Sequence, residues 1–155
     1  MINAHKMINN TNIYMKNFAF LLFFFASLSF STYQGTDPWT QKQLMEPVEL
    51  ADIINKGTTG YYIYGIGPAA FIKNSVEIGE GRDKKNIQKL KKAVIDLPKD
   101  ANIVIYCGCC PFADCPNVRP AFELLNQMKF TNHKLLNLSQ NFKVDWLDKG
   151  YPVNE

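Results

Sequence analysis

All four cysteines of the chain lie within one short segment, at Cys107, Cys109, Cys110 and Cys115. They directly follow residues 101–106, an apolar run that is typical of a strand buried on both faces. A thiolate is a nucleophile and a ligand for soft metals, so this segment has the strongest potential for chemistry. Cysteines spread along a chain can cross-link it, whereas cysteines this close together cross-link very little. We therefore interpret the segment as a chemical site rather than a disulfide framework.

Cys107 is the residue that we predict as a nucleophile. It is the first residue after the strand, and the next helix is expected to begin near Asn117. The loop between them is expected to direct several backbone amides at one point, which stabilises an anion. Such surroundings lower the pKa of a cysteine below its usual value of about 8.5. The alternative is an inert cysteine that packs as a small apolar group.

The other three cysteines leave several interpretations open. Cys109, Cys110 and Cys115 could form a local disulfide, act as resolving thiols or relay sulfur, because a thiol readily attacks a neighbouring persulfide. They are a poor match for structural zinc, which typically takes two pairs of ligands separated by a spacer. Copper(I) accepts two or three thiolates and is harder to exclude. The prediction is that the site holds no metal.

Helices and strands alternate from residue 47 onward. Helices are predicted at 47–56, 83–97, 117–128 and 142–147, and strands at 61–64, 101–106 and 134–138. This alternation predicts an α/β fold, a single three-layer domain with a central parallel sheet flanked by helices. Ligands bind beyond the carboxyl ends of strands in such sheets, and the cysteine segment lies at one of those ends.

Residues 1–31 are predicted to be an export signal that is cleaved. The run 18–30 is apolar and uncharged, follows Lys16, and precedes the small residue Ser31. An uncleaved anchor is the alternative, but a spanning helix needs about 20 apolar residues and this run is shorter. Translation starting at Met15 would suit a signal better than the polar, Asn-rich residues before it.

The expected organisation is therefore a linker at 32–43 followed by one folded domain at 44–155. We predict an exported protein, periplasmic in a bacterium, with no stable membrane insertion after cleavage. The formal charge of +3 arises from 17 basic and 14 acidic residues, an excess too small to predict a nucleic-acid partner. The lysines of the predicted helix 83–97 are interpreted as its solvated face.

The region from about Leu44 to Val153 resembles the rhodanese family of sulfurtransferases. The order of its elements is similar, and the strand 103–106 ends in Cys107, where the family has its active-site cysteine. The closing segment 146–153 is similar to the tryptophan-glycine-proline ending of the family. The resemblance implies a rhodanese-like α/β fold.

The resemblance also implies a thiosulfate-type sulfurtransferase activity. Cys107 would take a sulfane sulfur from a small anion such as thiosulfate, hold it as a persulfide and pass it to a thiol or to cyanide. Gly108, Cys109 and Cys110 would bind substrate, and Arg119 would attract the anionic donor. The implied reaction needs no metal or organic cofactor.

The segment also departs from the family, and the departures define the alternatives. The family's loop is about six residues long, whereas Arg119 lies twelve positions beyond Cys107. That spacing disfavours a cysteine phosphatase, in which a nearby arginine grips the phosphate. The alternatives are a non-catalytic thiol module that binds a soft metal or a partner protein, and a dithiol-disulfide redox protein. His133 is expected at the surface, so we predict no Cys-His pair.

Overall fold

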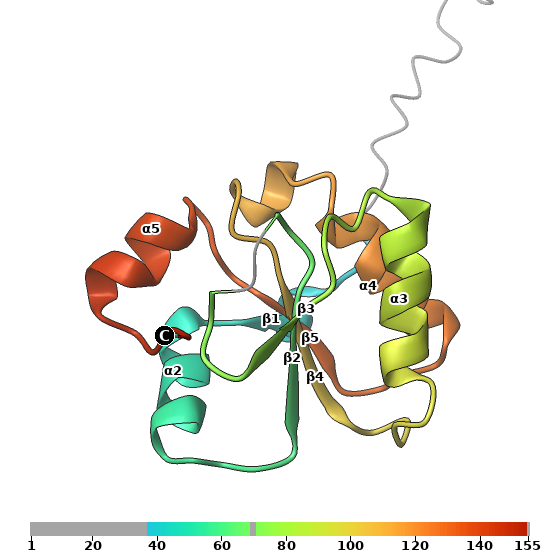
Figure 1. The fold of residues 1–155 in the computed structure, drawn as a ribbon, viewed down its shortest axis with the longest axis horizontal. Helices are drawn as coiled ribbons and strands as arrows, with labels where there is room; N and C mark the ends of the chain where they lie inside the picture. The colour runs from blue at the N-terminus through green and yellow to red at the C-terminus, as the bar shows by residue number, and fades with distance from the viewer. Residues whose placement is uncertain (1–36, 69–70, 155) are drawn as a thin grey trace, which may run out of the picture. The chain divides into compact units, whose positions relative to one another are not determined.

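The computed structural model describes residues 37–68 and 71–154. In this part of the chain, five parallel strands form one sheet in the order β1-β5-β4-β2-β3 (Figure 1). From one edge to the other, they are β1 (Leu44–Met45), β5 (His133–Leu136), β4 (Asn102–Tyr106), β2 (Tyr61–Gly65) and β3 (Ser75–Glu77). The predicted three-layer α/β class is confirmed.

Helices cover both faces of the sheet. α2 (Pro47–Asn55) and α5 (Phe142–Asp145) lie on one side, and α3 (Lys84–Val94) and α4 (Val118–Gln127) lie on the other (Figure 1). Local signals explain their bounds: a proline occupies the first turn of α2, and Asp83 caps α3 by accepting a hydrogen bond of 2.8 Å from the Lys85 amide. All four helices were predicted, α2 and α3 with the help of these signals and α4 from the spacing of its apolar residues.

The central strand β4 contributes to two cores. Ile103, Ile105 and Cys107 belong to the core shared with α3 and α4. Val104 and Tyr106 belong to the core shared with α2 and α5. Because successive side chains of a strand point to opposite faces, this alternation places Cys107 on the α3/α4 side of the sheet.

Several details differ from the sequence prediction, among them the end of α3, which lies at Val94 rather than at 97. The two edge strands β1 and β3 were not predicted, and β5 ends at Leu136, two residues before the predicted end at 138. The predicted helix at 142–147 is α5 followed by the short 3₁₀ helix η3 (Leu147–Lys149). Strands of two and three residues are too short to show a periodic pattern, so only pairing with a neighbour defines them.

The packed region begins before the predicted domain start at Leu44. Trp39 is buried, and its ring lies 6.0 Å from that of Phe112 and 5.7 Å from that of Phe122. At least this part of the predicted linker therefore belongs to the fold. The predicted export signal at 1–31 lies outside the described residues. Within the described ranges, no helix is long and apolar enough to cross a membrane.

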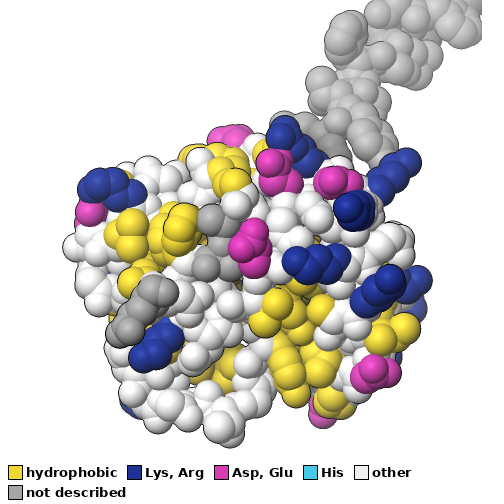
Figure 2. All heavy atoms as spheres, in the orientation of Figure 1, with side chains coloured by type: hydrophobic (Ala, Val, Ile, Leu, Met, Phe, Trp, Pro, Cys, Tyr) yellow, Lys and Arg dark blue, Asp and Glu magenta, His cyan; other side chains and the backbone are white. Residues whose placement is uncertain are grey.

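Charged side chains of both signs are interspersed on the face that Figure 2 draws. Basic side chains are frequent on the side where α3 lies (Figure 2). The lysines of α3 are exposed, whereas Leu90 and Val94 of the same helix are buried. The interpretation of these lysines as a solvated face is confirmed.

Trp146 closes the core on the α5 side. It is fully buried, its indole N–H donates a hydrogen bond of 3.0 Å to the carbonyl of Pro152, and its ring stacks on Phe142 at 6.4 Å. Replacing a buried tryptophan by alanine leaves a large cavity. We expect Trp146→Ala to lower the free energy of unfolding by about 3–5 kcal/mol, measured by urea denaturation. An unchanged denaturation midpoint would contradict this prediction.

Candidate functional site

Cys107 lies at the carboxyl end of β4, in the middle of the sheet. The neighbouring strand β2 continues its pairing there, because the Ile66 amide donates a hydrogen bond of 2.9 Å to the carbonyl of Tyr106. This pairing brings Gly67 so close that a Cβ atom on it would lie 2.8 Å from the Cys107 sulfur. Only glycine therefore fits at this position without a shift of Cys107.

The loop after Cys107 folds back and gathers the thiols. The Cys107 and Cys109 sulfurs lie 3.2 Å apart, and the Cys109 and Cys110 sulfurs lie 3.1 Å apart. The sulfurs of Cys107, Cys109 and Cys115 all lie within 4.8 Å of one another. All four cysteines are free thiols. The structure thus brings together thiols that the sequence places up to eight positions apart.

Several hydrogen-bond donors face the Cys107 sulfur. The Cys115 thiol lowers the pKa of Cys107 most. Among the donors, the backbone amide of Cys109 and the side-chain amide of Asn117 follow it. Together they outweigh burial and lower the pKa of Cys107 to about 5. The predicted lowering is confirmed, but its cause is corrected: side chains contribute most of it, and one backbone amide contributes rather than a cradle of several.

The neighbouring thiols keep their protons. Hydrogen bonding to Cys107 raises the pKa of Cys115, and burial adds to this effect. Loss of solvent around its sulfur raises the pKa of Cys109 to about 12, and the adjacent thiols of Cys110 and Cys107 add to it. One negative charge in the cluster opposes a second one nearby. Cys107 is therefore the thiolate, and Cys115 and Cys109 are donors to it.

Asn117 is the site residue that the sequence analysis did not select. It is buried, and its amide nitrogen lies 3.5 Å from the Cys107 sulfur and 3.9 Å from the Cys109 sulfur. Its side-chain oxygen accepts a hydrogen bond of 3.1 Å from the Arg82 backbone amide. An asparagine just before a helix usually caps it, but the Asn117 side chain makes no capping hydrogen bond to α4. Its amide nitrogen faces the sulfurs of Cys107 and Cys109 instead.

The other predicted binding residues have different surroundings. Gly108 packs against α5, since a Cβ on it would lie 3.2 Å from the Cβ of Phe142. Arg119 donates to the carboxylate of Asp37 at 2.6 Å and to the carbonyl of Ala113 at 2.8 Å. It also lies over the Trp39 ring, 5.2 Å from the centroid. The guanidinium of Arg119 therefore pairs with Asp37 and Ala113 rather than with the thiols.

His133 is buried rather than exposed, which corrects the sequence prediction. It is the first residue of β5, and its ring lies 4.5 Å from that of Phe122. Its Nε2 atom lies 2.9 Å from the side-chain oxygen of Asn126. Burial lowers its pKa and favours the neutral ring. The contacts of His133 with Phe122, Asn126 and Gln43 lie outside the thiol cluster.

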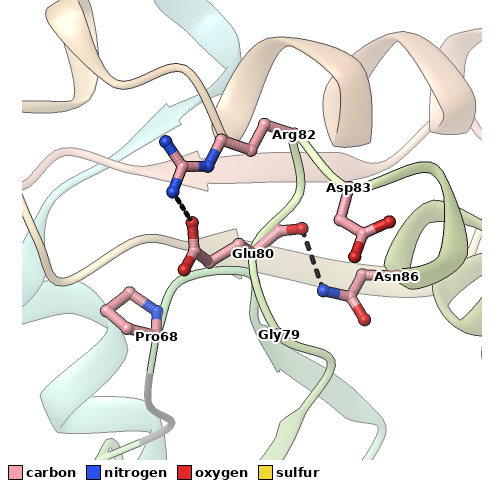
Figure 3. A pocket seen from close by; sticks show the side chains of 6 residues that line it. All are labelled: Pro68, Gly79, Glu80, Arg82, Asp83 and Asn86. Carbon is pink, nitrogen blue, oxygen red and sulfur yellow. Dashed lines mark hydrogen bonds and ion pairs between the residues drawn. The ribbon is translucent and has the colours of Figure 1, made fainter.

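A surface pocket of about 400 Å³ is lined by Pro68 and by residues at and just before the start of α3 (Figure 3). Pro68, which follows Gly67, forms one side, and the residues around the start of α3 form the other. Arg82 reaches across it in Figure 3 to pair with Glu80 at 2.5 Å, while its backbone holds Asn117. Two residues that line the pocket are connected to the thiol cluster. Pro68 directly follows Gly67, which approaches the Cys107 sulfur, and the Arg82 amide holds Asn117.

Comparisons with known proteins identify the fold. No family model matches the chain, and no curated protein is significantly similar to it. The solved structures that are similar include a protein from Bacillus halodurans, with a TM-score of 0.53 and 19% identity over 71% of this chain and 74% of that one. A rhodanese-like domain from Anabaena sp. has a TM-score of 0.50 and 15% identity, over 72% and 78% of the two chains.

A further similar structure is a full-length protein from Lactobacillus plantarum, with a TM-score of 0.52 and 13% identity. It covers 73% of this chain and 88% of its own length. Identities this low are informative about the fold alone. Function must be argued from the thiol cluster itself.

Proposed function

We propose that this chain, whose fold is rhodanese-like, is a sulfurtransferase that carries a sulfane sulfur on Cys107. One observation supports this proposal most: the thiolate at the end of the central strand is held by donors from Cys115, Cys109 and Asn117. A cysteine thiol whose pKa is lowered in this way is ionised to the thiolate at neutral pH. The same donors would stabilise the negative charge of a persulfide.

The proposed reaction has two steps. The Cys107 thiolate attacks the outer sulfur of thiosulfate, a new S–S bond forms, and sulfite leaves with the electron pair of the broken S–S bond. An acceptor thiolate then attacks the terminal sulfur of the persulfide and leaves with it, which regenerates the Cys107 thiolate. Cyanide removes the sulfur in the same way and leaves as thiocyanate. Neither step consumes an external electron donor.

Cys109 has a proposed part in the second step. Its sulfur lies 3.2 Å from that of Cys107, and the residue is exposed. It can therefore attack the inner sulfur of the persulfide while its thiol proton passes to the outer sulfur. The outer sulfur leaves as hydrosulfide, and a disulfide between Cys107 and Cys109 remains. Turnover by this branch needs an external dithiol reductant. Cys110 and Cys115 are proposed as neighbouring thiols of the same relay.

The experiment that tests the proposed function is sulfur loading. The fully reduced chain is incubated with thiosulfate, and its intact mass is measured before and after addition of cyanide. We expect a gain of one sulfur atom per chain, and its loss as thiocyanate. The proposal fails if the mass does not change with thiosulfate at neutral pH.

The short Cys107–Cys109 distance also favours a second candidate, a dithiol-disulfide oxidoreductase. In that case the two thiols would exchange reversibly with a disulfide substrate, and no sulfur donor would be needed. Sulfur loading separates the candidates, because only the transferase gains mass from thiosulfate. Export through residues 1–31 is a proposal compatible with both.

A further inference from the structure

We propose that Cys107, Cys109 and Cys115 form a binding site for one copper(I) ion. Their three sulfurs lie within 4.8 Å of one another, and all three thiols are free. Two of the residues are buried and one is exposed. This proposal departs from the sequence-based prediction that the site holds no metal. It goes beyond sulfur transfer and does not depend on it, since it requires only that the three sulfurs converge on one ion.

The chemical type of the ligands, which are thiolates, and their number, which is three, indicate copper(I). Among the described residues, no histidine or carboxylate joins this cluster. Cys110 is outside it as well, although its sulfur lies 3.1 Å from that of Cys109. Structural zinc takes four ligands in a tetrahedron, whereas soft thiolates select copper(I), which is satisfied with two or three. A site limited to three sulfurs therefore fits copper(I) better than zinc.

The surroundings of the cluster suit a bound metal. The Asn117 amide nitrogen lies 3.5 Å and 3.9 Å from two of the three sulfurs, and the Arg82 amide holds the oxygen of the same side chain. Hydrogen bonds of this kind orient the ligands of a metal site and raise its affinity for the metal. Cys109, the exposed ligand, gives an approach from solvent to the two buried sulfurs.

Copper(I) and a sulfane sulfur would compete for Cys107. Coordination forms copper–sulfur bonds to thiolates and releases their remaining thiol protons to solvent. No electron is transferred when the metal arrives as copper(I). A chain loaded with copper(I) is then expected to take up no sulfur from thiosulfate until a chelator removes the ion.

The test titrates the reduced, full-length chain with copper(I) under anaerobic conditions, in competition with a chromogenic copper(I) chelator. We expect one ion per chain, with three sulfur neighbours by X-ray absorption at the copper edge. Cys109→Ser and Cys115→Ser should each weaken binding by more than about 100-fold. Asn117→Ala should weaken it by about 10-fold. Cys110→Ser is the matched control and should retain the wild-type affinity.

Several outcomes would overturn the site. These are no copper(I) retained against the chelator, wild-type affinity in Cys109→Ser, or an equal loss in Cys110→Ser. Zinc that binds with four ligands and resists replacement by copper(I) would also overturn it. Because Cys109 is exposed, its variant tests the site even if Cys115→Ser does not fold. Sulfur loading of the metal-free chain is read separately, so this inference and the proposed function can fail independently.

Discussion

Cys107→Ser is expected to abolish sulfur uptake from thiosulfate, with a loss of at least about a thousandfold. The serine hydroxyl is not ionised at neutral pH and forms no persulfide. The substitution is nearly isosteric, and the groups that hydrogen-bond the Cys107 sulfur can also satisfy a buried serine hydroxyl, so the fold should persist. The measurement is the intact mass of the chain during incubation with thiosulfate. Near- and far-ultraviolet circular dichroism checks that the variant is folded.

Cys110→Ser is the matched comparison for Cys107→Ser. It removes a thiol from the same loop, but its sulfur contacts that of Cys109 and is not among the groups that affect the Cys107 pKa. Fragment-ion sequencing of the loaded wild-type chain should place the added sulfur on Cys107. If Cys107→Ser still gains a sulfur at the wild-type rate, another thiol is the nucleophile and the assignment is wrong.

The reactivity of Cys107 should depend on pH with an inflection near 5. Its pKa is lowered to about 5, so the thiolate is present above that pH and is protonated as the pH falls through it. An ordinary cysteine has a pKa of about 8.5, and its reactivity would still rise between pH 6 and 8. The measurement is the rate of alkylation at Cys107 by iodoacetamide, resolved by fragment-ion sequencing. A single inflection near 8.5 would contradict the prediction.

Two variants test the cause of the lowered pKa. Cys115→Ala removes the hydrogen bond with the largest effect, so the inflection should move upward by about one pH unit or more. Asn117→Ala should move it in the same direction by less, because its hydrogen bond has a smaller effect on the Cys107 pKa. We compare inflections rather than rates at one pH, because a higher pKa also makes a thiolate intrinsically more nucleophilic. Equal profiles for all three chains would show that other groups ionise Cys107.

The main elements could be predicted because each has a local signal. The apolar residues of β4 indicate a buried strand, and the proline of α2 and the Asp83 cap of α3 mark helix starts. Cys107 directly follows β4, so its position at a carboxyl edge of the sheet follows from the order of elements. Such signals lie within a few residues of each other along the chain.

The partners of Cys107 could not be predicted in the same way. Asn117 has the local signature of a helix cap, and only the path of the loop directs its amide to the thiols instead. Arg119 has the charge expected of an anion-binding residue, yet its guanidinium pairs with the carboxylate of Asp37, 82 positions earlier in the sequence. The burial of His133 likewise depends on where α4 packs, because Phe122 and Asn126 of that helix contact it.

The sequence by itself determined which face of each element is apolar and where one reactive cysteine follows a buried strand. Periodicity and caps encode these features, because they depend on neighbouring residues. Only the tertiary structure decided that Cys115 and Asn117 return to Cys107, that Gly67 approaches its sulfur, and that the thiolate belongs to Cys107. These features depend on distances between loops, and a loop's path is set by the packing of the elements that it connects rather than by its own residues.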